Sequence, residues 1–373
     1  MESTSSLLFT PLQSATLNTS NRLVVAPMSR VSASANGKVT EVMRDYYAAF
    51  AQGGFGTIIT EGVYTDAAAS KAYPTQPGLV SQQHMEGWKK IVQRVKEYDT
   101  KIFCQLMHAG ALSQAHKSTI APSIIQPLGK KMTAYGGSHG MFPLPKEASV
   151  EDIREVVEGF ATSAHLAFLA GFDGVEIHAA NGYFLDQFLT PYLNKRQDTY
   201  GGNVENDFRI IKEIYDAIRK VVPNDFGIGL RLSEGKVNHL DYRWQDGPEK
   251  ARQILKQAYT VSPSYIHIAA EKGDWFQDCS YPDGSSYTSI AKEIVKVPVI
   301  ANGGLHDFQK ARLVLEGGHA DLISLGKAAL ADPHLPNKFL KGINPIKFES
   351  EMIRHDARIK HYQLKDRSFC HAL

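Results

Sequence analysis

A regular alternation between short apolar runs and longer helical patterns is the feature of this sequence that most constrains its fold. Runs rich in β-branched and apolar residues predict eight strands, at 23–26, 57–62, 101–106, 174–178, 227–232, 265–269, 297–301 and 322–325. Helical patterns alternate with them, at 40–52, 83–97, 150–170, 204–221, 248–260, 287–296, 306–316 and after Pro333. Because strands that alternate with helices form a parallel sheet, eight such units predict an α/β fold, a closed (βα)8 barrel of the TIM type.

Capping residues support these helix boundaries. Asp307 and Asp332 stand where N-caps are expected, and Pro248 is suited to the first turn of its helix. The Gly-Gly pair at 317–318 is expected to end another helix. Since no charge run or low-complexity linker separates the units, we expect a single domain over residues 1–373.

Segments outside the repeat carry further expectations. The polar stretch 13–22 precedes the first strand and is expected to form a lid at the N-terminal face of the barrel. The connection 107–149 is long and rich in Gly, Pro, Ser and Lys, and because long connections are usually functional we expect it to fold over the site. A second insertion, 271–286, follows the sixth strand. The tail from Asn337 onward is long enough to reach either the barrel or a neighbouring subunit.

Charge, cysteine content and hydropathy exclude several classes of protein. Lys and Arg number 41 against 39 Asp and Glu, a formal net charge of +2, so nothing argues for a nucleic-acid or anionic-membrane partner. No apolar segment is long enough to cross a bilayer, and residues 1–10 lack the basic region of a secretion signal. The cysteines are scattered, which excludes a disulfide framework and favours a reducing, cytoplasmic setting; they are Cys104, Cys279 and Cys370.

The stretch 174–185 ends the fourth strand with three hydrogen-bonding side chains. Alternation along the strand turns Glu176 and His178 to one face and the apolar residues to the other. Asn181 follows closely enough for both it and His178 to donate to one acceptor, and the phenol of Tyr183 lies just beyond. Two donors on one oxygen, beside a proton source, are the groups needed to polarise a carbonyl and to protonate a neighbouring carbon.

Polar residues and glycines stand at the other strand ends, where (βα)8 barrels build their sites. They are Ser29, Glu61, Gly62, Gln105, Arg231, Asn302, Gly303, Gly304, Gly326 and Lys327. The glycines after the last two strands predict a phosphate site, because bare backbone amides at a helix start bind anions. Arg231 interrupts a buried apolar strand and therefore needs an anion. Glu176 on the adjacent strand is one candidate, and a ligand with negative charge along a planar edge is the other.

The motifs around these residues resemble those of the old yellow enzymes, the NADH:flavin oxidoreductase family of FMN-dependent ene-reductases, which are (βα)8 barrels. The resemblance covers nearly the whole chain. The most specific motif reads His-Ala-Ala-Asn-Gly-Tyr-Phe-Leu-Asp-Gln-Phe from position 178. The others lie at 21–30, 57–62, 105–110, 231–233, 301–304 and 320–327.

The resemblance implies one FMN, held without a covalent bond in the mouth of the barrel, and NADPH or NADH as the reductant. Ser29 would bond the flavin carbonyl near the reactive nitrogen, and Gln105 would bond the pyrimidine edge. Arg231 would lie beside the end of the ring that becomes anionic on reduction, and no metal is implied. The other implied cofactor-binding residues are Pro27, Met28 and Gly62, with Gly303, Gly304, Gly326 and Lys327 at the phosphate.

The resemblance also assigns catalytic roles. His178 and Asn181 would hold the carbonyl oxygen of an α,β-unsaturated substrate over the flavin. Hydride would reach the β-carbon from the reduced flavin, and Tyr183 would give a proton to the α-carbon. The expected partner is therefore a small enone-type molecule, and the sequence leaves a homo-oligomer open.

Three positions depart from the family pattern. Lys327 stands where Arg is usual, which replaces a bidentate phosphate contact by a point charge. Ser29 stands where the family has Thr or Cys, which is expected to shift the flavin potential modestly. Met107 stands where many members carry Trp, which is expected to leave a roomier pocket.

Other functions use parts of the same pattern. A flavin reductase of nitrate esters or nitroaromatics would need the same reduced flavin and anion-binding pocket. A non-redox phosphate-binding barrel, such as an aldolase or isomerase, would share the glycine loops, and Glu61 and Glu176 are its candidate carboxylates. A flavin-binding sensor is a third reading, against which the intact His178, Asn181 and Tyr183 argue.

Overall fold

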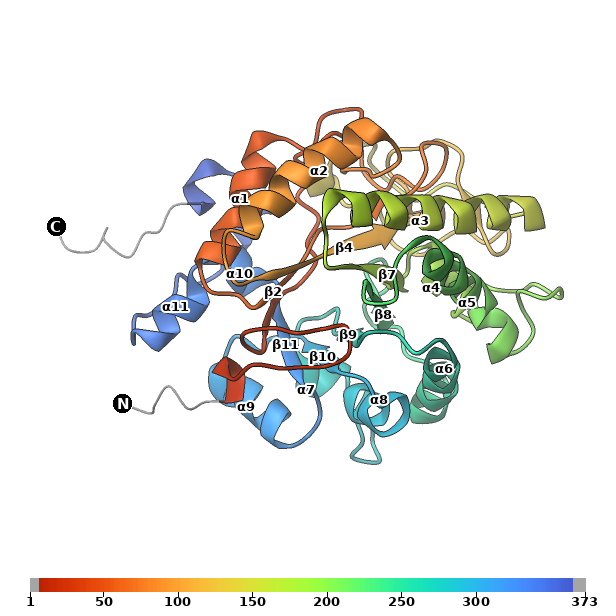
Figure 1. Cartoon of the computed structure of the whole chain (residues 1–373). Coiled ribbons are helices and arrows are strands. Elements are labelled where there is room, and N and C mark those ends of the chain that lie inside the picture. The colour runs from red at the N-terminus through yellow and green to blue at the C-terminus, as the bar shows by residue number, and fades with distance from the viewer. Residues whose placement is uncertain (1–6, 365–373) are drawn as a thin grey trace.

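Eight parallel strands close into a barrel that helices surround (Figure 1). The computed structural model describes residues 7–364; residues 1–6 and 365–373, and with them Cys370, lie outside that description. The ring runs β2-β1-β11-β10-β9-β8-β7-β4 and closes through the pairing of β4 with β2. The bounds are β1 Leu23–Val25, β2 Thr57–Ile59, β4 Lys101–Met107, β7 Gly174–Asn181, β8 Gly227–Lys236, β9 Ile266–Ala269, β10 Val299–Asn302 and β11 Leu322–Leu325. All eight predicted strands are therefore confirmed, together with the α/β barrel.

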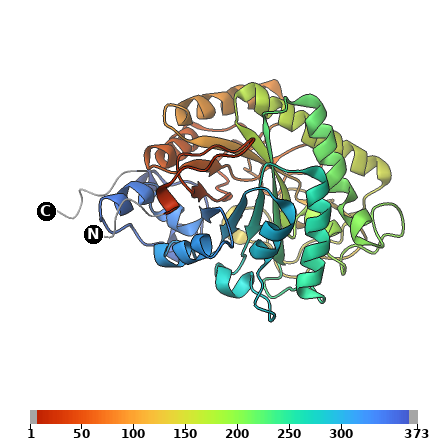
Figure 2. The same cartoon turned by 60° about the horizontal axis from the view of Figure 1, so that its bottom comes forward.

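The helices pack outside the ring and cover it in chain order (Figure 2). Those predicted from the sequence are α1 Glu41–Gln52, α2 Gln82–Val95, α3 Val150–Ala170, α5 Val204–Val221, α6 Gly247–Val261, α8 Tyr287–Val295, α9 Phe308–Glu316 and α11 Leu335–Leu340. Within residues 7–364, no helix combines the length and the hydropathy that crossing a membrane requires.

The sequence patterns missed several short elements. The helices α4 Phe184–Phe188, α7 Trp275–Asp278 and α10 Lys327–Ala331 contain five, four and five residues, too few to display a helical period. Short strands β3 Val63–Tyr64, β5 Ile120–Ala121 and β6 Lys146–Glu147 were missed for the same reason. In addition, β7 and β8 continue beyond their predicted ends, to Asn181 and Lys236.

Two of the three predicted N-terminal signals are confirmed and one is wrong. The Asp307 carboxylate accepts from the backbone amides of Gln309 and Lys310 in the first turn of α9, and Pro248 lies in the first turn of α6. Asp332 does not begin a helix. It follows the last residue of α10, and its carboxylate accepts from the backbone amide of His334 and pairs with Lys338 at 2.9 Å. The carboxylate thus links two short helices. In the sequence, a carboxylate in this role looks the same as an N-cap.

An apolar layer closes the N-terminal end of the barrel interior. It consists of Leu17, Val24, Ile59, Phe103, Tyr265, Ile300 and Leu322. The rings of Phe103 and Tyr265 meet edge to face, with centroids 5.4 Å apart. A Cβ on Gly174 or Gly227 would lie 2.4 or 2.7 Å from the Phe103 ring, so glycine is required at both positions. Since Leu17 belongs to the segment 13–22, the predicted lid at this face is confirmed.

Chain segments at the other face reach over the barrel mouth. The capping segment, residues 107–149, contributes Met132 and Tyr135 to the wall of the cavity there. The C-terminal tail packs against its own barrel, because the buried guanidinium of Arg30 donates to the carbonyls of Ala357 and Arg358 at 2.8 and 3.0 Å. The described part of the tail, up to residue 364, therefore reaches back to the barrel of its own chain.

Candidate active site

One cavity of about 490 Å³ lies at the carboxyl ends of the strands, and every residue predicted to bind the cofactor or to take part in catalysis lines it. The predicted residues in its wall are Pro27, Met28, Ser29, Gly62, Gln105, His178, Asn181, Tyr183, Arg231, Gly303, Gly304, Gly326 and Lys327. Residues that sequence reasoning did not select also line it, and they include Tyr73, Tyr135, Val237, Glu271, Ser324 and Ile353. The fold therefore brings together strand ends that lie up to 300 residues apart in the chain.

A chain of hydrogen bonds crosses the barrel interior beneath the cavity. The amide of Gln105 donates to one oxygen of Glu176 at 2.8 Å. The other oxygen of Glu176 lies 2.9 Å from Nδ1 of His267, whose Nε2 lies 2.8 Å from the hydroxyl of Ser324. Burial alone would raise the pKa of Glu176, but His267 and the other neighbours lower it, so the carboxylate is ionised. The cavity therefore rests on a rigid polar layer that carries one buried negative charge.

Arg231 lies over this layer and does not pair directly with Glu176. Its Nη1 is 3.1 Å from Nδ1 and 3.0 Å from Nε2 of His267, so the guanidinium contacts the imidazole that bonds the carboxylate. Burial and the neighbouring Arg231 lower the pKa of His267 to about 4, which keeps the ring neutral. Nε of Arg231 has no hydrogen-bond partner within residues 7–364. The carboxylate candidate thus supplies only an indirect counter-charge, and a donor of Arg231 is left for a ligand.

His178 and Asn181 extend from the end of β7 into the cavity. Burial, followed by Arg231 and His267, holds the pKa of His178 well below its usual range, so its imidazole is neutral and keeps one N–H donor. Asn181 has a positive φ of 67° and its backbone amide donates to Ser233 at 2.8 Å, which fixes the residue after the strand irregularity. The side-chain amide of Asn181 donates to Glu271. Both side chains can therefore present an N–H to one oxygen in the cavity.

Glu271 is the most conspicuous cavity residue that the prediction missed. Loss of hydration in the cavity wall raises its pKa to about 7, and Arg231 opposes that shift. It follows β9 with one residue between, so the strand-end rule applies to it, but it was assigned to the insertion 271–286. His267 was missed although strand parity turns it inward two residues after Tyr265.

Tyr183 lies beside His178 and opens the short helix α4. The ring centroids of these two residues are 5.2 Å apart, and the hydroxyl of Tyr183 is 2.7 Å from that of Tyr73. The turn between Asn181 and α4 is held by Asp186, whose carboxylate accepts from the Gly182 amide and pairs with Lys236 at 2.7 Å. Both partners of that ion pair are fully buried, so the turn that carries the phenol is rigid.

Glycines and one lysine form the end of the cavity beside β10 and β11. Gly303 and Gly304 have φ values of 123° and 64°, and a Cβ on either would lie 2.5 or 2.6 Å from the segment after β9. The backbone here must therefore stay bare. Lys327 begins α10, and its Nζ lies 5.8 Å from the ring centroid of Phe348.

The cavity fits the flavin nucleotide that the sequence predicts. Its volume lies in the range of roughly 300–1,000 Å³ that is usual for cofactor sites. The buried Nε of Arg231 and Nδ1 of His178 lack partners within the described residues, so polar groups of a planar ligand can meet them. Bare amides and a lysine at the opposite end suit a phosphate.

Glu61 serves the loop after β1 and not the cavity. One carboxylate oxygen accepts from the backbone amides of Arg30 and Val31 at 2.9 and 3.3 Å, and the other accepts from the Tyr47 hydroxyl at 3.3 Å. Burial raises the pKa of Glu61 to about 7. Because its oxygens are occupied in this way, Glu61 is not placed to act with Glu176 as a catalytic carboxylate pair.

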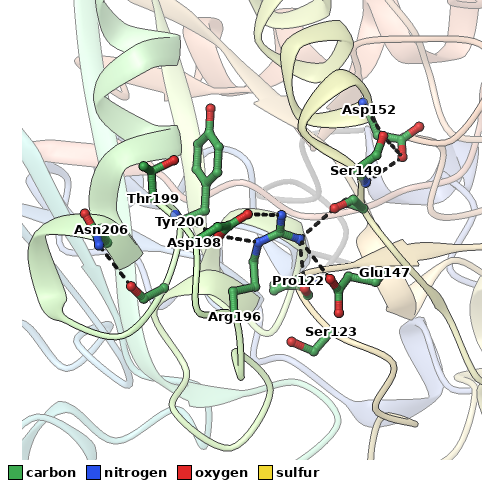
Figure 3. Close-up of polar contacts among 12 residues, drawn as sticks. Pro122, Ser123, Glu147, Ser149, Asp152, Arg196, Asp198, Thr199, Tyr200 and Asn206 are labelled. Carbon is green, nitrogen blue, oxygen red and sulfur yellow. Dashed lines mark hydrogen bonds and ion pairs between the residues drawn. The ribbon is translucent and has the colours of Figure 1, made fainter.

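Arg196 fastens the capping segment to the block that follows β7 (Figure 3). Its Nη1 donates to the carbonyls of Pro122 and Ala148 at 3.1 and 2.6 Å, close to β5 and β6. Asp198 accepts from the other side of the guanidinium, at 3.0 and 2.5 Å. One buried cation therefore holds the capping segment at two points, on either side of Tyr135, which lines the cavity.

Comparison with known sequences gives matches along nearly the whole chain. Residues 7–345 match the NADH:flavin oxidoreductase / NADH oxidase family. The chain is 31% identical over 328 residues to an NADH oxidase of Thermoanaerobacter brockii, a match that covers 86% of this chain and 49% of that protein. It is 32% identical over 371 residues to the flavin oxidoreductase hxnT of Emericella nidulans, covering 92% of each. The chain spans about half the length of the NADH oxidase and of a metal reductase of Desulforamulus reducens.

Solved structures give the same result for the fold. An old yellow enzyme homologue from Zymomonas mobilis superimposes with a TM-score of 0.85 at 27% identity, covering 96% of this chain and 98% of that one. Morphinone reductase superimposes with a TM-score of 0.83 at 27% identity, covering 95% and 94%. The fold is thus shared over nearly the full length of these proteins.

Proposed function

The chain belongs to the NADH:flavin oxidoreductase / NADH oxidase family, and from this premise we propose that it reduces the activated C=C bond of α,β-unsaturated carbonyl compounds. NADPH or NADH is the proposed source of electrons. This reaction class is supported by two relatives, one named "probable flavin mononucleotide-dependent alkene reductase" from Leishmania infantum and one named 12-oxophytodienoate reductase 7 from Oryza sativa. The proposed substrate is a small enone-type molecule.

The cofactor of this family is FMN, and the chemistry that it supplies when bound is hydride transfer. We assign the flavin ring to the wall formed by Ser29, Gln105 and Arg231, because all three line the cavity and carry hydrogen-bonding groups. The phosphate is assigned to the bare backbone at Gly303 and Gly304 and to Lys327. These assignments place a fixed positive charge beside the ring, which favours a reduced flavin that carries negative charge.

His178 and Asn181 bind the substrate oxygen in this proposal. Each offers an N–H, and a neutral imidazole can donate without first losing or gaining a proton. Negative charge grows on that oxygen only as the β-carbon is reduced, so the two donors stabilise the transition state more than the ground state. Tyr183 supplies the proton that the α-carbon then needs.

The observation that carries the proposal is the convergence of two neutral donors and a phenol at the end of β7. All three side chains line one cavity, above a polar layer that holds Arg231 at its floor. The reaction of a phosphate-binding barrel without redox chemistry does not require the guanidinium of Arg231 at the floor of the cavity together with the neutral donors His178 and Asn181. Membership of the flavin family also argues against that alternative.

Binding of a phenol, which presents an oxygen as an enone does, tests the assignment. His178→Ala and Asn181→Ala are each expected to weaken phenol binding roughly tenfold or more, since each removes one hydrogen bond to a partly charged oxygen. The change in flavin absorption during a phenol titration measures this affinity, and FMN should stay bound. His165→Ala, at an exposed position on α3, is the matched control. Unchanged phenol affinity in both site variants would overturn the proposal.

A further inference from the structure

We propose that Tyr73 is a positioning residue for the proton transfer: its hydroxyl donates to Tyr183, turns the Tyr183 proton into the cavity and stabilises the tyrosinate that the transfer leaves. The inference rests on the proposed function, because it takes Tyr183 as the proton donor. It assigns a role to a residue on the loop after β3, which lies 110 positions from Tyr183 in the chain.

The two phenols form an isolated pair. Their oxygens are 2.7 Å apart, and the side chains are buried, with 1% and 6% of their surface exposed for Tyr73 and Tyr183. Within residues 7–364, neither hydroxyl has another hydrogen-bond partner at normal distance. A buried hydroxyl pair of this kind shares one proton between the oxygens and leaves the second proton for an outside acceptor.

Both phenols line the cavity, so the direction of the shared bond follows from which of them gives a proton to the substrate. If Tyr183 donated to Tyr73, its proton would point away from the substrate oxygen site and from the carbon beside it. If Tyr73 donates, the Tyr183 proton is free to turn toward the cavity, past the ring of His178, whose centroid is 5.2 Å away. Burial raises the pKa of both phenols, but their mutual bond lowers that of Tyr183 and raises that of Tyr73. Tyr73 therefore holds its proton more tightly, and Tyr183 is the phenol of the pair that can give its proton up.

Tyr73 is held rigidly enough to fix this bond. Its ring stacks on that of Tyr135 in the capping segment, with centroids 4.8 Å apart and planes at 22°. The buried side chain of Gln76 accepts from the backbone amide of Ala72 at 2.6 Å and donates to the carbonyl of Gly62 at 2.7 Å. The turn that carries Tyr73 is thus bonded through Gln76 to Gly62, a residue assigned to the flavin site. This bond keeps the two phenols in a fixed position relative to the cofactor site.

The step balances as a proton transfer between oxygen and carbon. The O–H bond of Tyr183 breaks, a C–H bond forms at the α-carbon of the enolate, and the electron pair of the O–H bond stays on the Tyr183 oxygen. The negative charge therefore moves from the substrate to Tyr183, where the Tyr73 hydroxyl donates to it. A proton from water restores Tyr183 when the product leaves. A hydrogen bond to a charged oxygen is stronger than one to a neutral phenol, so Tyr73 contributes most after the proton has left.

The two half-reactions of Tyr73→Phe test this role. With the holoenzyme reduced by NADPH, reoxidation by cyclohexenone is expected to slow roughly 10- to 100-fold, the loss typical for a hydrogen bond to a charged group. The solvent deuterium isotope effect on this reoxidation should rise, because proton transfer then limits the rate of the step more strongly. Flavin reduction by NADPH and reoxidation by oxygen should keep their wild-type rates, since neither uses the Tyr183 proton. In the apoprotein, the NMR signal of the Tyr183 ring carbon that bears the hydroxyl should shift.

Two comparison variants make each outcome decisive. Tyr287→Phe removes another buried hydroxyl, one without a partner in the described residues, and should change none of these quantities. Tyr183→Phe should slow the enone step at least as much as Tyr73→Phe does. If Tyr183→Phe slows it and Tyr73→Phe leaves rate and isotope effect unchanged, the role of Tyr73 is wrong. If neither variant affects the enone step, the proposed proton donor itself is wrong.

Discussion

The barrel interior holds two layers built on the same strands, and they differ in almost every property. The lower layer is apolar and includes Phe103, Tyr265 and Leu322. Two residues further along the same strands stand Gln105, His267 and Ser324, which belong to the polar chain beneath the cavity. Since alternate residues of a strand face the same way, both layers face the barrel interior. They are separated by about 7 Å along the strands.

The difference shows how the fold separates stability from chemistry. In the lower layer, glycines on β7 and β8 make room for aromatic rings, and Leu17 of the lid completes the packing. In the upper layer, the polar groups are hydrogen-bonded to one another. Nitrogen atoms of Arg231 and His178 have no partners in the described residues. We therefore expect changes in the lower layer to alter folding, and changes in the upper layer to alter the binding of ligands.

The largest effect on this comparison is expected from Phe103→Ala in the lower layer. Removing a buried ring from a closed layer leaves a cavity, so the free energy of unfolding should fall by about 3–5 kcal/mol. Chemical denaturation measures this loss, and the folded fraction should bind FMN with normal affinity. Phe276→Ala, at a residue 40% exposed on α7, is the control for loss of a ring. A loss below about 1 kcal/mol would contradict the structural role of the layer.

Arg231→Met tests the upper layer with a side chain of similar length. The dissociation constant of FMN should rise roughly 10- to 100-fold, because a charged hydrogen-bond donor is lost. The stability of the apoprotein should stay close to that of the wild type, since the desolvation cost of a buried cation is removed together with its contacts. Fluorescence titration of FMN and thermal unfolding of the apoprotein give both quantities. Unchanged FMN affinity with lowered stability would make Arg231 a structural residue of the same kind as Phe103.

Glu271→Gln tests whether the ionisation of Glu271 in the cavity wall lowers the free energy of unfolding. The pKa of Glu271 is raised from 4.5 to about 7, so its contribution to stability is present below pH 4.5 and is lost as the pH rises through 7. The variant should therefore be more stable than the wild type at pH 8, by roughly 1–3 kcal/mol, and equal to it near pH 4.5. Because Glu61 titrates in both proteins, the difference between their stability curves isolates Glu271. Curves that stay parallel from pH 4.5 to pH 8 would show that Glu271 is not perturbed.

The smallest effect is expected from Lys327→Arg at the phosphate end. A guanidinium can bond two phosphate oxygens where the ammonium provides one point charge, so FMN should bind a few-fold more tightly. Equilibrium titration of the apoprotein detects a change of this size, with Lys341→Arg, at an exposed position after α11, as control. Unchanged or weaker FMN binding would indicate that Lys327 does not face the phosphate.

Most of the barrel could be predicted from the sequence because its signals are local. A buried parallel strand is an apolar run of four to eight residues, and the eight runs were found even where β7 and β8 proved longer. The helices α4, α7 and α10 could not be found in this way, because one turn of helix has no period. Asp332 was misread because a carboxylate that joins two short helices has the same sequence context as an N-cap.

The candidate site could be predicted where it lies on strand ends and not where it depends on contacts between loops. Strand parity identifies Glu176 and would have identified His267, which faces the same interior two residues after Tyr265. Tyr73, Tyr135 and Ile353 reach the cavity from three separate loops, and nothing in their neighbouring residues points to it. The bond between Tyr73 and Tyr183 is visible only in three dimensions.

The most direct test of the central claim is the visible spectrum of the purified protein under anaerobic conditions, recorded before NADPH, after NADPH and after cyclohexenone. We expect a yellow protein that NADPH bleaches and that regains its colour when the enone is added. Colour that returns only with oxygen or a nitro compound would contradict the proposed reduction of C=C bonds, and a colourless protein that takes up no added FMN would contradict the flavin site itself.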